Sequence, residues 1–221
     1  MIKPKIKTVT QSNADEAIGT VVLAFSGDPI ARWFYPDPHR YLFHMPSFVQ
    51  AFAGKAIEHN SAYYVDGYLG AAFWLPPDVH PDEDALATLL QRTIPEENQQ
   101  EIFAFMEQMD RAHPFEPHWY LPMIGVDPGK QGHGYGSALL KHVLERCDGE
   151  GKVAYLEASS PKSIPLYQRH GFEQVGTIQV GSSPRLFPML RKPRLVVPRS
   201  EDFPFSKPIG TEPNSIPVFN A

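Results

Sequence analysis

Two spacings of apolar residues alternate along the chain, and together they predict a mixed series of helices and strands. Apolar residues at every third or fourth position are typical of helices that bury one face, whereas short apolar or alternating runs are typical of strands. The expected helices cover residues 13–25, 38–57, 134–147 and 163–171, with two more between 79 and 109. The expected strands cover residues 5–9, 61–65, 68–75, 118–126, 153–158, 172–180 and 185–190.

Turn-forming residues and prolines indicate how this series is divided. Asp66-Gly67 stands between two aromatic runs and predicts a β-hairpin over residues 61–75. The helical pattern of residues 79–112 follows, and we expect it to be a loosely attached insert. Beyond Lys192, prolines recur every few residues without an apolar period. We therefore predict a single domain at 1–195 that contains the insert, followed by an extended Pro-rich tail at 196–221.

A glycine-rich turn joins one expected strand to one expected helix. The apolar run Tyr120–Val126 leads to Gly132, Gly134 and Gly136, and the helical pattern continues from Ser137. Such a turn leaves unpaired backbone N–H groups at the positive end of the helix dipole, where phosphate and other anions bind. The third glycine comes one residue too early for the dinucleotide-binding fingerprint, and the Gly-Lys-Ser/Thr of a P-loop is absent.

The turn resembles the pyrophosphate loop of the GCN5-related N-acetyltransferases (GNAT), V-x-P-x-x-Q/R-x-x-G-x-G/A. The matching residues are Val126, Pro128, Gln131, Gly134 and Gly136. A second run resembles the later half of the same signature and comprises Leu156-Glu157-Ala158-Ser159, Pro161, Tyr167 and Gly171-Phe172. The two runs together span residues 119–172. Three stretches are particularly similar to the puromycin N-acetyltransferase branch: Pro117-His118-Trp119, Leu156-Glu157 and Pro165-Leu166-Tyr167.

The resemblance implies an α/β (α+β) fold, with a mixed, mostly antiparallel sheet of about seven strands and helices on both faces. It also implies acetyl-CoA as the cofactor, with the pyrophosphate on the loop backbone and the pantetheine arm along the preceding strand. The residues expected to bind CoA are Ile124, Val126, Gln131, Gly132, His133, Gly134, Tyr135, Gly136, Ser137 and Ser163. The family often has asparagine where this chain has Ser163, so a direct contact to the cofactor is shortened or lost there.

The same resemblance implies direct transfer of the acetyl group from the thioester to an amine in a ternary complex, without an acyl-enzyme. Tyr167 is the implied general acid, with its hydroxyl near the CoA sulfur, and Glu157 is the implied base that takes the amine proton. The backbone N–H of Val126 is the implied oxyanion donor. His118 is the alternative base, because imidazole has a more suitable intrinsic pKa. The choice between these two bases stays open.

The acceptor amine is not identified by these motifs. Five aromatic residues are candidates for the wall of its pocket, and we expect only one or two of them to serve: Trp33, Phe34, Tyr35, Trp74 and Trp119. Asp28 could attract a cationic amine or merely cap a turn. We expect N-acetylation of a primary amine on a small molecule. The alternatives are acetylation of a protein or peptide amine, and a CoA-binding sensor without catalysis.

Composition narrows the expected partners and location. The net charge of −5 argues against a nucleic-acid partner. The single cysteine, Cys147, allows no intrachain disulfide and fits a reducing, cytoplasmic location. The nine histidines lack ligand spacing, so we expect no metal site, and we expect neither a signal peptide nor a membrane-spanning run. The tail could lie on the surface, cross to the partner subunit of a homodimer, or be disordered.

Overall fold

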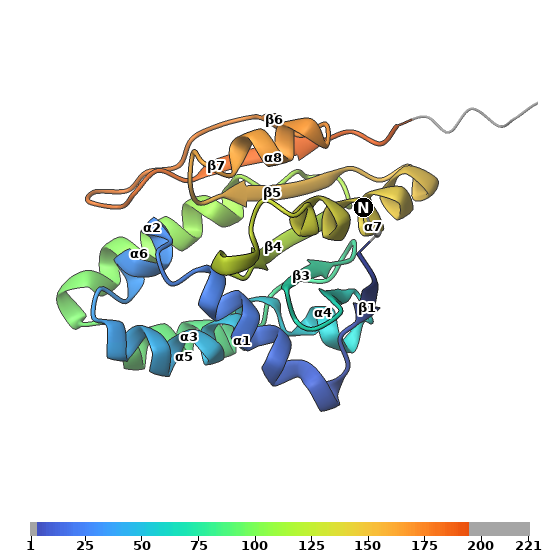
Figure 1. The fold of residues 1–221 in the computed structure, drawn as a ribbon. Helices are drawn as coiled ribbons and strands as arrows, with labels where there is room; N and C mark the ends of the chain where they lie inside the picture. The colour runs from blue at the N-terminus through green and yellow to red at the C-terminus, as the bar shows by residue number, and fades with distance from the viewer. Residues whose placement is uncertain (1–3, 195–221) are drawn as a thin grey trace, which may run out of the picture.

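One seven-stranded sheet forms the centre of the computed structural model, which describes residues 4–194 (Figure 1). The strands are β1 Ile6–Thr8, β2 Ala62–Val65, β3 Gly70–Leu75, β4 Trp119–Val126, β5 Ala154–Ala158, β6 Glu173–Gln174 and β7 Phe187–Arg191. Their order is β1-β2-β3-β4-β5-β7-β6, and every neighbouring pair is antiparallel except β4–β5. The predicted mixed, mostly antiparallel sheet of seven strands is therefore confirmed. The predicted tail at 196–221 lies outside the described residues.

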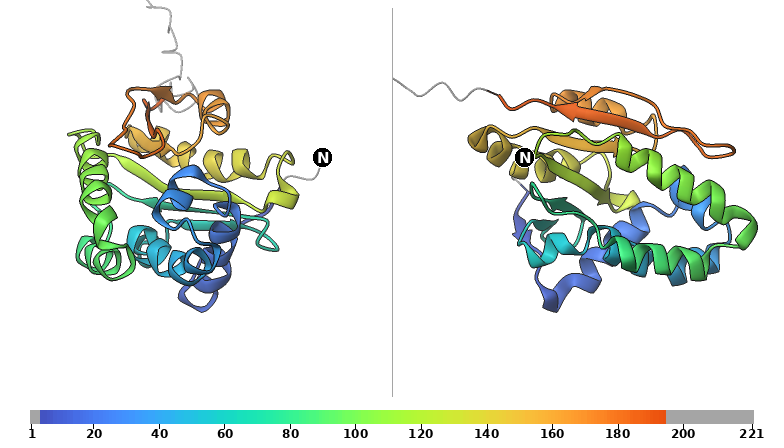
Figure 2. Two further views of the ribbon diagram at one scale, coloured as in Figure 1. Left: turned by 90° about the vertical axis from the view of Figure 1, so that its left-hand side faces the viewer. Right: turned by 180° about the vertical axis from the view of Figure 1, so that it is seen from behind.

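Helices cover both faces of the sheet (Figures 1 and 2). They are α1 Ala14–Ala24, α2 Pro29–Phe34, α3 Pro38–Ala53, α4 Lys55–Glu58, α5 Glu83–Thr93, α6 Glu96–Arg111, α7 Tyr135–Glu150 and α8 Ile164–Arg169. Buried residues of α1, α3, α5 and α6 form one apolar core, and those of α7 and α8 form a second. The six-residue helix α2 had not been expected, because it is too short to show a helical period.

Alternation along the strands builds the two cores. In β3, Phe73 and Leu75 belong to the core beneath α1 and α3, whereas Ala72 and Trp74 belong to the core beneath α7. Successive side chains of a strand point to opposite faces, so a strand buried on both faces is apolar at every position. The sequence of β3 is therefore continuously apolar and does not alternate between apolar and polar residues.

A bulge in β4 interrupts this regular alternation. Phe73 pairs with Met123 and Leu75 pairs with Tyr120, so β4 carries one residue more than β3 over this stretch. Tyr120 and Met123 consequently face the same core although they are three residues apart. Pro122 lies within the bulge, where a residue without a backbone N–H is tolerated. Pro122 was the signal in the sequence that could have predicted this irregularity.

The parallel pairing of β4 with β5 is short, and this shapes the molecule. The two strands pair only at Trp119–Ala154 and Tyr120–Tyr155, near the start of each strand. The bulge in β4 follows directly, and beyond it β4 continues to Val126 without a paired residue on β5. The strands therefore diverge towards their carboxyl ends and leave an opening in the sheet.

The helical insert is not loosely attached, and in this respect the sequence-based prediction was wrong. Helices α5 and α6 occupy the predicted span 79–112, but Leu90, Ile102 and Phe105 are almost completely buried in the same core as α1 and α3. The apolar stripe of each helix is the reason, because such a stripe must be buried against another element. The predicted strand 172–180 is also mostly irregular, with β6 at its start and a single bridge from Ile178 to Leu186.

A buried ion pair joins β7 to the ends of α7 and α8. Arg191 Nη2 lies 2.8 Å from Asp148 Oδ2, and Arg191 Nε donates to the carbonyl of His170 over 3.0 Å. The backbone N–H of Arg194 also donates to Asp148 Oδ1. Burial tends to raise the pKa of the Asp148 carboxyl, but the hydrogen bonds from Arg191 and Arg194 outweigh it and leave that pKa below its usual range. The pair therefore fixes α8, which carries Tyr167, against the sheet.

We expect Asp148→Asn to lower the free energy of unfolding by about 3 kcal/mol at pH 7, because it leaves the Arg191 charge buried without its partner. Because the folded-state pKa of Asp148 is depressed, its contribution is present above its unfolded-state pKa of about 3.9 and is lost as the pH falls. The difference from wild type should therefore shrink below about pH 4. Urea unfolding followed across the pH range measures this.

Asp66→Asn provides the matched control, because Asp66 pairs with Lys7 at the surface and exposed pairs contribute little. Equal losses of stability in the two variants at pH 7, or a difference for Asp148→Asn that does not shrink as the pH falls below about 4, would contradict the assignment.

Candidate active site

The glycine-rich turn after β4 begins with a 3-10 turn, Pro128–Lys130, and ends where α7 starts. Gly132 and Gly134 have φ angles of +80° and +82°, a region that favours glycine. A Cβ atom would meet no neighbour at either position, so glycine is required there by the backbone conformation and not by lack of room. At Gly136 the reason differs, because a Cβ atom would lie 3.3 Å from Leu166 of α8.

The turn presents a row of free backbone donors. Among residues 4–194, no acceptor pairs with the N–H groups of residues 131–137, and the first bond of α7 runs from Ala138 N–H to the Gly134 carbonyl. Residues 131–134 are exposed to solvent. Consecutive N–H groups at a helix N-terminus bind anions, since the helix dipole adds to their partial charges. The turn therefore fits a pyrophosphate group.

Three polar side chains of this turn are held by the protein itself. Gln131 donates to the Val126 carbonyl over 3.4 Å, and His133 Nδ1 lies 2.9 Å from the Gln131 carbonyl. Ser137 Oγ lies 3.0 Å from Nε2 of His170. These three predicted CoA-binding residues are thus arranged to offer backbone N–H groups, while their side chains stabilise the shape of the turn. The ring of His133 also stacks on Tyr135.

The opening between β4 and β5 lies next to the turn. Pro122, Ile124 and Val126 are partly exposed along the diverging half of β4, whereas the residues between them are buried. The β5 side of this half of β4 has no strand partner among the described pairings. An unpaired strand edge can hydrogen-bond an extended molecule in the manner of an added strand. Ile124 and Val126 lie on this unpaired edge, and their contact with an extended arm stays a prediction.

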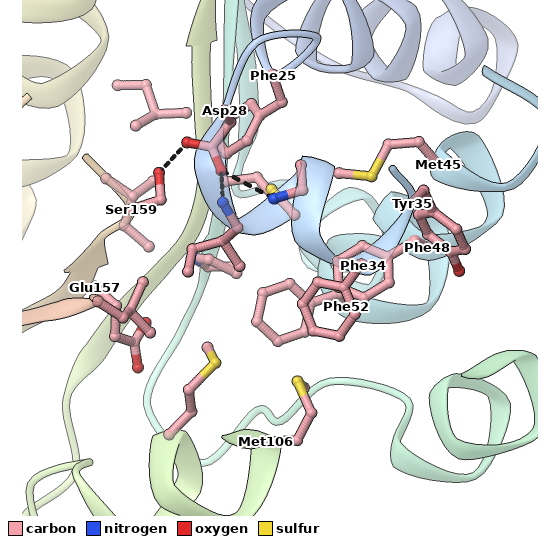
Figure 3. A pocket seen from close by; sticks show the side chains of 18 of the residues that line it. Phe25, Asp28, Phe34, Tyr35, Met45, Phe48, Phe52, Met106, Glu157 and Ser159 are labelled. Carbon is pink, nitrogen blue, oxygen red and sulfur yellow. Dashed lines mark hydrogen bonds between the residues drawn. The ribbon is translucent and has the colours of Figure 1, made fainter. Parts of the chain in front are cut away.

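A cavity of about 70 Å³ lies at this opening (Figure 3). Ile124, Glu157 and Tyr167 line one part of it, and aromatic and methionine side chains of α2 and its C-cap, α3 and α6 line another. The latter group includes Phe34, Tyr35, Met45, Phe48, Phe52, Met106 and Met109. In Figure 3, Glu157 and Ser159 approach from one side and the phenylalanine rings from the other. The predicted catalytic residues Glu157 and Tyr167 therefore line the same cavity as the aromatic side chains, although they are distant from them in the sequence.

Glu157 is a buried carboxylate with an unsatisfied oxygen. Its side chain is 3% exposed, and among residues 4–194 its Oε1 accepts no hydrogen bond. The nearest basic group is His113, whose Nε2 lies 3.4 Å from Oε1. Burial raises the pKa values of Tyr120 and Tyr155, and the nearby Glu157 carboxylate raises them further, both by its charge and as an acceptor for their hydroxyls. Neither hydroxyl bonds Oε1 in hydrogen-bond geometry. A buried acceptor without a donor is costly, and it is suited to receiving a proton.

Asp28 lines the same cavity but has no free oxygen. Its Oδ1 accepts from the N–H groups of Ile30 and Ala31 at 3.0 and 3.1 Å, which caps α2, and its Oδ2 accepts from the Ser159 hydroxyl. Burial raises the pKa of the Asp28 carboxyl, although these hydrogen bonds oppose the rise. Of the two roles considered for Asp28, the structure shows the cap. Of the two carboxylates among residues 4–194 that line the cavity, Glu157 is therefore the one with an oxygen that accepts no hydrogen bond within that range.

Tyr167 enters the cavity from α8. Pro165 stands in the first turn of this short helix, as expected, and Ser163 precedes it, with its hydroxyl donating to the Ser160 carbonyl. Burial, with a smaller effect from Asp28, raises the pKa of Tyr167, so its hydroxyl remains protonated at neutral pH. The structure thus brings Glu157 and Tyr167 to one cavity, which Ser163 does not line.

The alternative base, His118, lies outside this cavity. It lines a neighbouring cavity of about 530 Å³, and its Nε2 lies 3.1 Å from Nδ1 of His113. His113 therefore stands between His118 and Glu157, a placement that no pattern in the sequence predicts. Trp74 and Trp119 are also absent from the acceptor cavity, because both belong to the core beneath α7.

A loop after β6 closes one side of the cavity. Glu101 of α6 accepts from the backbone N–H and the hydroxyl of Ser182, and Trp33 donates to the same hydroxyl over 3.2 Å. Leu186, at the end of this loop, lines the cavity. Trp33, a predicted wall residue, does not line the cavity. It bonds Ser182 of this loop instead, and its ring packs against Phe105.

Two further properties concern the described residues as a whole. No group of three or more His, Cys, Asp or Glu side chains within 4–194 is arranged to hold a metal ion. No helix in that range has both the length and the apolar character needed to cross a membrane.

Comparison with known proteins agrees with this geometry. The model of the acetyltransferase (GNAT) family matches residues 29–172. An uncharacterised N-acetyltransferase of Schizosaccharomyces pombe is 23% identical over 210 residues, which cover 85% of this chain and 83% of the relative.

Solved structures show the same fold. A Corynebacterium glutamicum protein described as histone acetyltransferase HPA2 and related acetyltransferase has a TM-score of 0.63 at 24% identity, covering 88% of this chain and 98% of the other. A Drosophila melanogaster polyamine N-acetyltransferase that forms N-acetylagmatine has a TM-score of 0.61 at 14% identity, covering 85% and 99%. The family model matches well over half of the chain, across the turn, the diverging strands and the cavity, and the chain therefore belongs to the GNAT family of N-acetyltransferases.

Proposed function

We propose that this acetyltransferase binds acetyl-CoA in the opening between β4 and β5. Acetyl-CoA is the general donor of the family, and it supplies an activated acetyl thioester when bound. The free N–H groups of residues 131–136 would hold the pyrophosphate, and the open edge of β4 at Ile124 and Val126 would pair with the pantetheine arm. The Ser137 side chain is engaged by His170, so it would contribute through its backbone.

The acceptor we propose is a primary amine on a small molecule. The cavity is compact, and no lysine or arginine is among the described residues that line it. An apolar wall with a buried carboxylate suits a cationic amine carried on an apolar or aliphatic body. The Drosophila enzyme of the same fold acts on a polyamine, which is a substrate of this chemical class.

The roles of two residues follow from their surroundings. Glu157 has an unpaired buried oxygen and would take a proton from the amine. Tyr167 remains protonated and would donate to the departing thiolate. The nitrogen then forms a bond to the acetyl carbon as the carbon–sulfur bond breaks. The meeting of these two groups at one cavity is the observation that carries the proposal.

The same observations argue against the two alternative functions, acetylation of a protein or peptide amine and CoA sensing without catalysis. A protein or peptide acceptor would need an extended groove, whereas this cavity is compact and is lined on one side by Leu186, from the loop that bonds Glu101 through Ser182. A CoA-binding sensor would need the glycine turn but neither Glu157 nor Tyr167. The finer assignment to the puromycin N-acetyltransferase branch rests on the stretches at 117–119, 156–157 and 165–167 alone, and it stays a prediction.

The cofactor site is tested by Gly134→Asp. We expect the dissociation constant for acetyl-CoA to rise about tenfold or more, a loss of about 1.4 kcal/mol, because the new carboxylate repels the pyrophosphate. Isothermal titration calorimetry measures it. Gly134→Ala separates the backbone strain at φ +82° from the charge, and should weaken binding less. Gly149→Asp, which adds the same charge at the far end of α7, should bind as wild type does. Equal binding by Gly134→Asp and Gly149→Asp would exclude the turn as the pyrophosphate site.

The acceptor class is tested by thiol release from acetyl-CoA over a panel of amines. We expect kcat/KM to be highest for small primary amines, such as agmatine and arylalkylamines, and much lower for peptide N-termini or peptidyl lysine. Tyr167→Phe should lower kcat for the best amine, because the thiolate loses its proton donor. Faster acetylation of the peptides than of any small amine would reverse the substrate assignment. Tight acetyl-CoA binding without thiol release from any amine would instead support the sensor.

A further inference from the structure

A line of ionisable side chains connects the acceptor cavity with the neighbouring one. Glu157 lines the first cavity, whereas His113 and His118 line the second and not the first. Glu157 Oε1 lies 3.4 Å from His113 Nε2, His113 Nδ1 lies 3.1 Å from His118 Nε2, and His118 Nδ1 lies 2.8 Å from the Glu116 carbonyl. Each contact uses a different nitrogen, so the three side chains form a continuous chain of proton-exchanging atoms.

The end of this chain determines the tautomer of each ring. The Glu116 carbonyl can only accept, so His118 Nδ1 carries a proton. In a neutral His118, Nε2 is then an acceptor, which places a proton on Nδ1 of His113. Neutral His113 consequently turns an acceptor nitrogen towards Oε1 of Glu157, which is itself an acceptor. A proton arriving on Glu157 would give these two facing acceptors the hydrogen bond that neither can donate.

Packing holds the two rings in line. The His113 ring lies 4.5 Å from the Tyr120 ring and 4.6 Å from the Tyr155 ring, measured between centroids, and the His118 ring lies 5.8 Å from that of Tyr155. Both histidines are partly exposed, whereas Glu157 is almost fully buried. The chain therefore runs from a dry end at the acceptor cavity to a wetter end at Glu116, which is exposed.

The proposed reaction needs such a path. An ammonium group that becomes an amide loses two protons from nitrogen, and the departing thiolate takes up one. Each turnover must therefore export one net proton. Glu157 is too buried to pass it to water directly, and a Glu157 that stays protonated cannot take a proton from the next amine.

We infer that His113 and His118 form a proton relay that carries the amine proton from Glu157 to the second cavity; this inference rests on the proposed function. Glu157 gives its proton to His113 Nε2, and the Nδ1 proton of His113 passes to His118 Nε2. The Nδ1 proton of His118 then leaves to water beside the Glu116 carbonyl. Proton exchange with water at each partly exposed ring, with one proton gained on Nδ1 and one lost from Nε2, restores the starting tautomers. His113 and His118 touch no substrate and act through Glu157.

The surroundings of His118 favour its neutral form, which can accept a proton from His113. Burial lowers the pKa of His118, and the nearby His113 and His80 lower it further, while the Glu116 carbonyl and the Glu157 charge oppose this. His118 is therefore mostly neutral at pH 7 and able to accept a proton. Its low pKa also favours rapid release of that proton to water.

The relay is tested with His113→Gln and His118→Gln and the best amine of the panel. Glutamine keeps a side chain that can form hydrogen bonds, but it cannot take up and release a proton at neutral pH. We expect kcat to fall about tenfold or more, while the KM for acetyl-CoA stays unchanged. The solvent deuterium isotope effect on kcat should increase, because proton export, which we expect to share in limiting the wild-type rate, then limits it alone. Free imidazole should restore part of the lost kcat.

His59→Gln is the matched control, since His59 is exposed and lines neither cavity. It should keep the wild-type kcat. An unchanged kcat in both relay variants would overturn the relay. So would a loss that imidazole does not restore and that leaves the isotope effect at its wild-type value, because that pattern indicates a structural role only.

A second measurement needs no variant and covers the case in which one fails to fold. A proton inventory of the wild type in mixtures of H2O and D2O should curve, because several protons move together along the relay, whereas a straight line would overturn it. Failure of the proposed function looks different, because the wild-type protein would then acetylate no small amine at all.

Discussion

The divergence of β4 from β5 is the constraint on which the candidate site depends. Two parallel strands that pair at only two positions would normally leave costly unpaired backbone groups. Here the bulge at Pro122 turns β4 away from β5, and the exposed edge becomes the place where an extended cofactor arm can pair. Without the extra residue in β4, pairing could continue along both strands and the opening would close.

Two separate apolar cores stabilise the sheet around this opening. Side chains of β3 pack beneath α1 and α3 on one face and beneath α7 on the other, so the sheet is held from both sides where β4 and β5 part. The buried Arg191–Asp148 pair adds a fixed point between β7, α7 and α8. Glu157 of β5 and Tyr167 of α8 are consequently presented by elements that cannot easily shift.

The sequence predicted the cofactor half of the site far better than the acceptor half. The glycine turn is local, because its spacing, the strand before it and the helix after it are contiguous in the chain, and Gly132 and Gly134 adopt the left-handed conformation that only glycine favours. Glu157 and Tyr167 were found through motif resemblance. The acceptor cavity instead depends on how α3 and α6 pack, so Phe48 and Met106 were indistinguishable from ordinary core residues.

Histidine placement shows the same limit. His118 attracted attention through its intrinsic pKa, yet it stands one ring away from Glu157, and His113 was not singled out at all. The distance between these rings depends on the irregular segment between α6 and β4, whose course no periodicity predicts. Trp74 and Trp119 failed as pocket candidates for a related reason, because the face on which a strand residue lies depends on register.

A crystal structure of the protein with coenzyme A would show directly whether the cofactor occupies the opening between β4 and β5. We expect pyrophosphate oxygens at about 3 Å from the backbone nitrogens of residues 131–136, with the pantetheine arm along β4 and the sulfur beside Tyr167. Coenzyme A bound elsewhere, or bound with its sulfur remote from the cavity that Glu157 and Tyr167 share, would contradict this expectation.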